Sequence, residues 1–314
     1  MSIWSYILKR ILQGIPIIII VSFISFFLIR LSPVDPLAEL RMNPSITKQT
    51  LEAEKIRLGL DKPVIIQYFI WGKNFIRGDM GTTVSGERVS AKIKERAFNT
   101  LLLSLSVIFW TWIIGIPLGI IAALNYRSTF DRILTVVSSI GMAIPSFFFA
   151  ILLLIFAQKS GLFPIGGLTC PNFSDMDFTH KILDIAHHLF LPTVVLTTIS
   201  LAGLSRQMRS NLLDVLDSDY VKFARAKGLP PSKVIIKHAL RNAINPLVTL
   251  LGFEFAALLS GAALTEYVFQ YPGLGRLILE AVMKSDINLV MASLIIGSFM
   301  LIAGNILSDI LLKL

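Results

Sequence analysis

The sequence predicts an all-α integral membrane protein with six transmembrane helices. Two features of the composition indicate this class: 54% of the 314 residues are hydrophobic, and only 16% are charged. Water-soluble domains usually carry about 25% charged residues. The third observation is that the charged residues lie between long apolar stretches rather than along them. A water-soluble enzyme is therefore not expected.

Six stretches are candidates for crossing a membrane. A bilayer core is about 30 Å thick, so a helix that spans it needs about 20 apolar residues. Five stretches reach or approach this length without an acidic or basic side chain: 11–29, 100–124, 133–157, 189–205 and 287–308. The sixth, 243–265, is interrupted by one acid, Glu254, and a single carboxylate can face a protein interior.

The first span follows Lys9 and Arg10, a pattern that secretory signal peptides share. Its 19 uncharged residues exceed the apolar core of a signal, and no small-x-small cleavage site follows. We therefore expect residues 1–31 to form an anchor helix that is retained. Prolines within the spans predict kinked helices, because proline removes one backbone donor: Pro16, Pro117, Pro145 and Pro192.

The positions of the basic residues predict the orientation. The formal net charge is +9, and the loop 206–245 holds eight Lys and Arg, against two each in 158–188 and 266–286. Cytoplasmic loops are enriched in Lys and Arg, so both termini are predicted to be cytoplasmic. Residues 32–95 form an extracytoplasmic region, which is long enough to cross regardless of its charge and in which one helix is predicted at 47–58. No nucleic-acid partner is expected.

The cytoplasmic loop 206–246 shows three helical signals. The fourth span continues into the loop as an amphipathic helix, and a second helix starts at Ser218 or Asp219 and stops at Gly228. After the turn at Pro230-Pro231, a third helix is predicted from Ser232. It has the basic stripe Lys233, Lys237 and Arg241 and, among its apolar positions, Ile236, Ala239 and Leu240, before residues 242–246 lead into the fifth span.

Two interpretations of this loop are open on periodicity alone. A basic amphipathic loop can lie on anionic lipid. The small residues Ala224 and Ala226, beside Tyr220 and Phe223, instead favour a short helix inserted into a cleft of another protein.

The second helix reads Asp219-Tyr220-Val221-Lys222-Phe223-Ala224-Arg225-Ala226-Lys227-Gly228 and is followed by His238-Ala239-Leu240-Arg241-Asn242-Ala243 and Pro246. It closely resembles the cytoplasmic coupling loop of ABC importer permeases, in the dipeptide, oligopeptide and nickel branch of the type I fold. Further segments agree along essentially the whole chain: Gly78-Asp79-Met80-Gly81, Asn99-Thr100-Leu101, Gly115-Ile116-Pro117-Leu118-Gly119, Pro145-Ser146-Phe147 and Glu266-Tyr267-Val268-Phe269-Gln270-Tyr271-Pro272-Gly273-Leu274-Gly275-Arg276.

The chain departs from the family pattern in a few places. Lys222, Phe223 and Ala224 stand where the coupling signature classically has an acid and two alanines, as the peptide branch commonly allows. Val34 replaces the Gly of a Pro-Gly-Asp-Pro segment, and Asp286-Ile287-Asn288 stands in place of Asp-Tyr-Pro. These departures affect the expected identity of the substrate more than the expected class of protein.

The resemblance implies a type I permease domain over 96–310, with the coupling loop at 206–246, in a bacterial-type cytoplasmic membrane. It implies four kinds of partner: a second permease subunit, expected to be a non-identical homologue; two cytoplasmic ABC ATPase subunits; an extracytoplasmic substrate-binding protein; and the lipid bilayer. The expected cargo is a small peptide, with nickel or a metal chelate as the alternative. The chain has no Gly-x-x-x-x-Gly-Lys-Ser/Thr phosphate loop, so the partners are expected to hydrolyse ATP. We predict that this chain binds no cofactor and is not an enzyme.

The resemblance also identifies a docking helix for the ATPase, whose expected residues are Asp219, Tyr220, Lys222, Phe223, Ala224, Arg225, Ala226, Lys227 and Gly228. Tyr220 and Phe223 are the expected anchors, because buried aromatic side chains dominate many interfaces. The basic side chains of Lys222, Arg225 and Lys227 are expected to pair with acidic residues at the rim of the partner's groove.

Glu254, Pro145 and Ser146 are candidate residues of the translocation path. Glu254 has three interpretations: a packing residue, a contact for a substrate amine, or a proton relay. The last would suit an ion-coupled secondary carrier, which the absence of inverted repeats disfavours. A membrane-bound enzyme is disfavoured because no Gly-x-Ser-x-Gly segment is present.

A metal site is conceivable in the outer loop, where His180, His187 and His188 lie near Asp175, Asp177 and Asp184. His187 and His188 are adjacent, however, and neighbouring side chains on a helix diverge by about 100°. We therefore predict no metal site.

Overall fold

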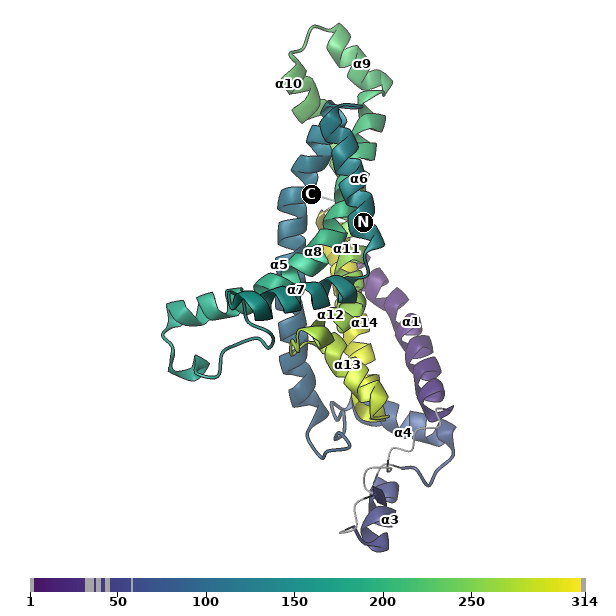
Figure 1. Cartoon of the computed structure of the whole chain (residues 1–314). Helices are drawn as coiled ribbons and strands as arrows, with labels where there is room; N and C mark the ends of the chain where they lie inside the picture. Colours follow the sequence, from purple (N-terminus) through teal and green to yellow (C-terminus); the bar gives the residue numbers. More distant parts are fainter. Residues whose placement is uncertain (1–2, 32–36, 38–40, 43–45, 58, 312–314) are drawn as a thin grey trace. The chain divides into compact units, whose positions relative to one another are not determined.

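The computed structural model describes residues 3–31, 37, 41–42, 46–57 and 59–311 (Figure 1). These residues are helical except for connecting loops and one isolated antiparallel bridge between Thr82 and Arg88. The predicted all-α class is confirmed. The helices form two compact units, each discontinuous in sequence: unit 1 contains 1–99 and 273–302, and unit 2 contains 100–272 and 303–314.

Four helices are long and apolar enough to cross a membrane: α1 (Ile3–Leu31), α5 (Val89–Leu124), α8 (Phe178–Leu216) and α14 (Ile287–Leu311). A fifth candidate is the pair α6 (Thr129–Ala143) and α7 (Ser146–Ser160). These five candidates, found among the described residues, match five of the six predicted spans. The other predicted span falls largely in α11 (Arg241–Gly261), and its crossing of the membrane stays a prediction.

The third predicted span, 133–157, is broken rather than continuous. α6 and α7 meet at an angle of 95°. The break lies at Ile144 and Pro145, both in extended conformations with ψ of 121° and 135°. Proline disfavours the helical conformation of the residue before it, so Ile144 ends one helix and Pro145 caps the next. The expectation that Pro145 only kinks a helix is therefore wrong, whereas Pro16, Pro117 and Pro192 do lie inside helices.

Unit 1 contains two helices that lie outside the predicted spans and precede α5. The predicted helix at 47–58 is confirmed as α3 (Lys48–Arg57), with Leu58 outside the described residues. A second helix, α4 (Val64–Ile76), was not predicted. Tyr68 of α4 packs edge-on against Phe26 of α1, with ring centroids 5.5 Å apart.

The core of unit 1 joins the start of α5 to α13 (Leu274–Met283) and α14 through buried Val89, Ile93, Leu274, Leu277 and Ala281. The turn before α5 is fastened to the start of α14 by two hydrogen bonds. Asp286 accepts from the Val84 N–H at 2.8 Å, and the Asn288 amide donates to the Thr82 carbonyl at 3.0 Å. Burial raises the pKa of Asp286, while the two backbone donors Val84 and Leu289 act in the opposite direction.

Unit 2 is organised around α8, which packs against α6, α7 and α11. It also contains η1 (Phe173–Asp175), α9 (Asp219–Ala226), α10 (Pro231–Lys233), the π-helix η2 (Val234–Leu240) and α12 (Ala263–Val268). α5 approaches α8 closely at Gly119, where an added Cβ would lie 2.6 Å from the Ser205 carbonyl oxygen. Small residues permit such close approach between membrane helices, so Gly119 has a packing role.

A buried ion pair fixes the start of α6 to α8. The guanidinium of Arg209 donates to Asp131, with Nη2 to Oδ2 at 2.8 Å. The Asp131 carboxylate also accepts from the Arg127 N–H at 2.9 Å, and its side chain is only 4% exposed. The carboxylate is therefore satisfied from two sides.

We expect Asp131→Asn to destabilise the chain by about 3 kcal/mol, because it leaves the Arg209 charge without its partner. Thermal unfolding of both proteins in one detergent, followed by circular dichroism, measures the effect. The matched control is Asp177→Asn, whose pair with His180 is exposed on both sides, and it should leave the unfolding temperature unchanged. Equal unfolding temperatures for Asp131→Asn and the unsubstituted chain would contradict this role.

Candidate functional site

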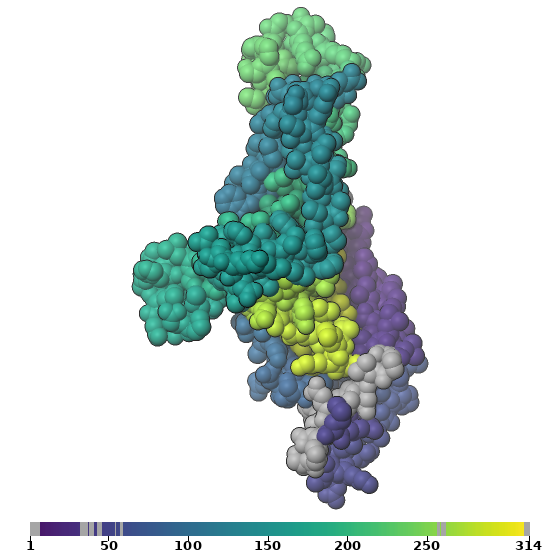
Figure 2. Space-filling view, viewed as in Figure 1, coloured from purple at the N-terminus to yellow at the C-terminus, as the bar shows by residue number. Residues whose placement is uncertain are grey.

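The loop 206–246 folds into a compact hairpin of helices, which Figure 2 shows in green at one end of unit 2. α8 extends to Leu216, and α9 follows with Ser218 in an extended conformation before its first residue. α9 ends before Gly228, whose φ of +76° lies in the left-handed region that glycine adopts readily. The predicted second helix and its glycine stop are confirmed.

α9 has an inner and an outer face. Val221 and Ala224 are buried, at 0% and 6% exposure, in a core that includes Met208 and Leu212 of α8 and Ala239 of η2. Ala224 was predicted within the docking surface, but the structure places it in the chain's own core. Its small side chain lets α9 lie close against α8 and η2.

The outer face of α9 is both apolar and basic. Tyr220 and Phe223 are exposed, at 45% and 62%, and so are Lys222, Arg225, Ala226, Lys227 and Gly228. The ammonium of Lys227 lies 4.6 Å from the Phe223 ring centroid. Tyr220 Oη accepts from the Asn242 side-chain amide at 2.8 Å, which anchors this face to α11.

Charge pairs stabilise the start of α9. Lys222 Nζ lies 2.8 Å from the Asp217 carboxylate, at the turn between α8 and α9. The hydrogen bond lowers the pKa of Asp217 and raises the pKa of Lys222, so both stay charged at neutral pH. Lys222 is thus already paired with Asp217 of its own chain, whereas Arg225 has no ion pair within the described part of the molecule.

The third helix of the loop is confirmed, but it is not a uniform α-helix. α10, η2 and α11 follow one another without a break from Pro231 to Gly261, so residues 242–246 lead into the fifth predicted span within one continuous helix. Pro246 lies inside α11, and Asn211 of α8 donates to the Ala243 carbonyl in the same turn at 3.2 Å. The carbonyl that Pro246 leaves without its helical donor is that of Asn242, four residues earlier.

The π-helix changes which side chains are exposed. Ile236, expected among the apolar positions of the third helix, is 65% exposed, whereas Ala239 is fully buried. A π-turn carries more residues per turn than an α-turn, so positions predicted from an α-helical period rotate away from the core. Ile236 is therefore a third large apolar residue that the loop exposes, in addition to Tyr220 and Phe223.

A second candidate site is a cavity of about 580 Å³ in unit 2. It is lined by α8 and α11 and by Ser146, the first residue of α7. Both Glu254 and Ser146 line it, as predicted path residues, and Pro145 directly precedes Ser146. Its polar lining residues from α8, Ser200 and Gln207, were not predicted. Ser200 lies within the predicted span 189–205 and Gln207 lies just after it, and no local signal marks either as part of a cavity.

Glu254 has a specific partner in this cavity. Its Oε2 accepts a hydrogen bond from the Trp112 Nε1–H of α5 at 3.0 Å. The Trp112 indole N–H can only donate a hydrogen bond, and a carboxyl oxygen can accept it whether Glu254 is ionised or neutral. Glu254 also lines a cavity with few polar groups, so its carboxyl group is suited to contact a polar group that enters.

Sequence reasoning missed a buried pair that joins Glu266 of α12 to Thr100 of α5. Glu266 is fully buried and accepts from Thr100 Oγ1 at 2.9 Å. Tyr271 is also fully buried, its N–H donates to the Glu266 carbonyl at 2.8 Å, and burial raises the pKa of its phenol. Thr100 and Glu266 were noted only as positions in separate motifs, because the contact that pairs them spans 166 residues of the chain. Glu266, Phe269 and Tyr271 are buried, whereas Tyr267 and Gln270 of the same segment are exposed.

The three histidines of the outer loop do not converge. His180 pairs with Asp177, and His187 contacts the Leu162 carbonyl at 2.9 Å.

His188 instead lies with Cys170 and Asp184, and the potential ligand atoms of these three side chains are all within 4.8 Å of one another. These three side chains could hold a metal ion by distance. Asp184 already accepts from the Cys170 N–H at 2.9 Å, and the Asp184 hydrogen bond together with burial raises the pKa of the Cys170 thiol. Because thiolate is the ligand form, the absence of a metal stays our prediction.

Comparison with known proteins agrees with these features. Residues 115–314 match the family described as "binding-protein-dependent transport system inner membrane component", and residues 3–88 match its N-terminal domain. The chain is 38% identical over 310 residues to the oligopeptide transport system permease protein AppB of Bacillus subtilis, covering 98% of this chain and 96% of that protein. It is 36% identical over 326 residues to the di/tripeptide transport system permease protein DppB of Pseudomonas aeruginosa, covering 98% and 96%.

A putative peptide permease protein of Brucella suis is 36% identical over 310 residues, covering 97% of this chain and 95% of that protein. The resemblance predicted from the coupling loop is confirmed, and a permease rather than an enzyme is the class to which these relatives belong. By its family match over most of its length, this multi-pass membrane chain belongs to the binding-protein-dependent transport system inner membrane components, the permeases of ABC importers.

Proposed function

We propose that this chain is the permease subunit through which an ATP-driven importer moves small peptides. The observation that carries the proposal is the outer face of α9, where Tyr220 and Phe223 are exposed beside basic side chains while Val221 and Ala224 hold the helix on its core. Large apolar side chains that are exposed together on a packed helix mark an interaction surface. Ile236 of η2, a helix that packs against α9, is also exposed. The names of the relatives support peptides as the cargo.

The proposed partner of this face is a cytoplasmic ABC ATPase subunit. Tyr220, Phe223 and Ile236 would fill its groove, and Arg225 and Lys227 would meet acidic residues at the rim. One such ATPase would dock here and a second on a homologous, non-identical permease. A substrate-binding protein would deliver the cargo on the opposite side, and both termini of this chain would be cytoplasmic, as the basic loop requires.

The cavity that contains Glu254 is the proposed contact point for the cargo. A carboxylate in a mostly apolar cavity gains a favourable interaction with an ammonium group that enters it. Small peptides carry such a group at the amino terminus. Ser146 and Gln207, which line the same cavity, would contact the peptide backbone.

The docking face is tested by Phe223→Ala combined with Ile236→Ala. Both side chains are more than half exposed, so we expect the chain to fold and insert normally. Because truncation of an interface anchor costs about 2 kcal/mol or more, ATPase retention during purification in mild detergent should fall at least about tenfold. The matched control is Met283→Ala, a substitution of an exposed apolar residue on α13, which should retain the ATPase. Full retention in the double variant would contradict docking on this face.

Two further substitutions separate docking from folding of the loop. Gly228→Val places a branched side chain at a φ of +76°, and strain of about 1–3 kcal/mol should distort the end of α9. Ala224→Glu puts a carboxylate into the core beneath α9. We expect both to block transport while the chain still inserts, and both to increase protease cleavage within 206–246, which Phe223→Ala should not do. Unchanged transport in either variant would count against the role of this helix.

Glu254→Gln tests the cavity. A hydrogen bond to a charged group contributes about 1.5–3 kcal/mol, so kcat/KM for a peptide with a free amino terminus should fall about tenfold or more. The N-acetylated peptide should be transported at an unchanged rate. Reconstituted vesicles loaded with ATP measure both, and Glu52→Gln, an exposed acid on α3, is the control. Equal losses for the two peptides would exclude the ammonium contact.

A further inference from the structure

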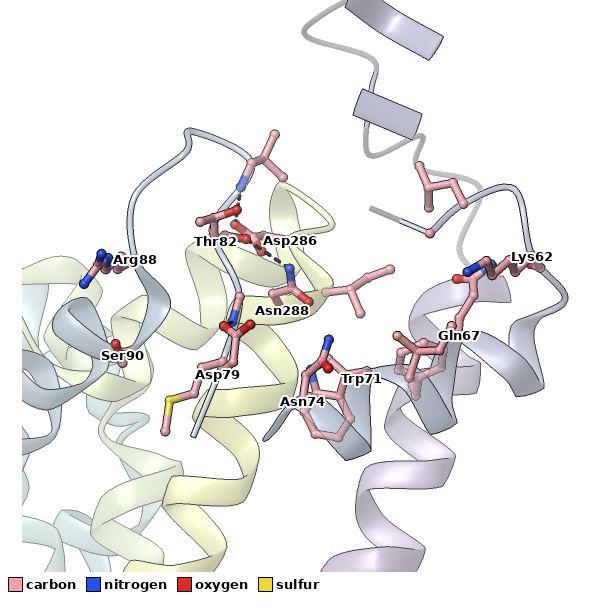
Figure 3. Close-up of a pocket in the computed structure, with 18 of the residues that line it drawn as sticks. Lys62, Gln67, Trp71, Asn74, Asp79, Thr82, Arg88, Ser90, Asp286 and Asn288 are labelled. Atoms are coloured by element: carbon pink, nitrogen blue, oxygen red, sulfur yellow. Dashed lines mark hydrogen bonds between the residues drawn. The ribbon is translucent and has the colours of Figure 1, made fainter. Parts of the chain in front are cut away.

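Unit 1 contains a cavity of about 770 Å³ that the proposed transport mechanism does not use. Its walls come from the last turns of α1, from α4, from the turn 77–84 and from the start of α14. Figure 3 shows Gln67, Trp71 and Asn74 on one side of this cavity, with Asp79, Asp286 and Asn288 facing them. The cavity is polar, in contrast to the apolar cavity beside Glu254.

Three polar atoms in its wall are buried without a hydrogen-bond partner among the described residues: Arg30 Nε, Gln67 Oε1 and Trp71 Nε1. Gln67 is the clearest, because its side chain is 8% exposed and its amide nitrogen is already engaged by the Lys62 carbonyl at 2.6 Å. Buried polar atoms without a partner are rare and each costs about 1–3 kcal/mol. A ligand that carries both hydrogen-bond acceptors and a donor has the groups that these two donors and one acceptor lack.

The charge of the wall favours an anion. Four basic residues line the cavity, Arg30, Lys62, Arg77 and Arg88, against two acids, Asp79 and Asp286. None of these four cations forms an ion pair within the part of the chain that the structure describes. The acids are engaged by backbone N–H groups: Asp79 accepts from Gly81 at 2.9 Å, and Asp286 accepts from Val84 at 2.8 Å. An anionic ligand would therefore meet cations that are not paired with an acid; the Arg30 guanidinium carbon also lies 5.7 Å from the Phe26 ring centroid.

The cavity lies where a membrane span ends. Arg30 is in the last turn of α1, a helix long and apolar enough to cross the bilayer. The neighbouring α4 packs its Tyr68 against α1 and exposes a row of apolar side chains on the other face, Ile65, Phe69 and Ile76, at 54%, 67% and 88%. An amphipathic helix with tryptophan and tyrosine at a span end is typical of the membrane–water interface.

We propose that this cavity binds the headgroup of an anionic phospholipid. The phosphate would accept hydrogen bonds from Arg30 Nε and Trp71 Nε1, and a headgroup hydroxyl would donate to Gln67 Oε1. Phosphatidylglycerol has both groups, a phosphate and a glycerol hydroxyl pair. The exposed apolar face of α4 would lie among the acyl chains of the surrounding lipid, which holds the helix at the depth of the headgroups.

The test uses the full chain, purified in mild detergent together with the subunits that accompany it. Binding of dihexanoyl-phosphatidylglycerol is measured by native mass spectrometry and by titration, with dihexanoyl-phosphatidylcholine and inorganic phosphate as separate probes. Trp71→Phe removes one donor and keeps the aromatic ring, and Arg30→Gln removes the charge. The matched controls lie outside the cavity: Trp110→Phe, and Lys73→Gln on the same helix α4.

We expect phosphatidylglycerol to bind the unsubstituted chain at least tenfold more tightly than phosphatidylcholine. Each cavity variant should weaken this binding about tenfold, as loss of a hydrogen bond to a charged group does, while both controls retain it. Because Trp71→Phe is conservative, its loss of binding with an unchanged unfolding temperature separates ligand contact from misfolding. Equal binding of the two lipids, or equal effects of cavity and control variants, would overturn the proposal. Displacement of the lipid by inorganic phosphate or by a transported peptide would also overturn it, in favour of a free anion or of the cargo.

Discussion

The structure depends on the constraint that a polar side chain among membrane helices must find its partner inside the protein, because lipid offers none. Three contacts meet it between elements far apart in sequence. Asp131 is held by Arg209, Glu266 by Thr100, and Glu254 by Trp112. Each contact joins two different helices of unit 2, so the polar groups that are costly to bury also determine which helices lie together.

These contacts differ in how completely they satisfy the carboxylate. Asp131 receives a guanidinium and a backbone N–H, and Glu266 is fully enclosed. Glu254 receives one neutral donor and lines a cavity. An acidic side chain whose hydrogen bonds are all made suits a fixed contact between helices. An acidic side chain with hydrogen bonds still unmade can bind a ligand. This difference in environment is the reason that we propose Glu254, rather than Asp131 or Glu266, as a contact in the transport path.

The sequence predicted the features whose causes are local. The apolar stretches, the start of α9 near Ser218 and its end before Gly228 all follow from neighbouring residues. The inward position of Ala224 could not be predicted, because it depends on packing against α8 and η2. Ile236 was assigned by an α-helical period, and the π-turn altered that period. The partner of Glu254 is 142 residues away along the chain, and no local pattern connects Trp112 to it.

Two helices connect the proposed docking face to the Glu254 cavity, and through them motion at one can reach the other. α8 packs its Met208 and Leu212 beneath α9, and its Gln207, directly before Met208, and Gly203, five residues before Met208, line the cavity. α11 is joined to α9 through the Asn242 to Tyr220 hydrogen bond and carries Glu254 three turns further along. Hydrogen-bonded helices transmit displacement because they resist bending over a few turns. A rotation imposed on α9 by its partner would therefore move both walls of the cavity, and the relative displacement of α8 and α11 would change the space around Glu254.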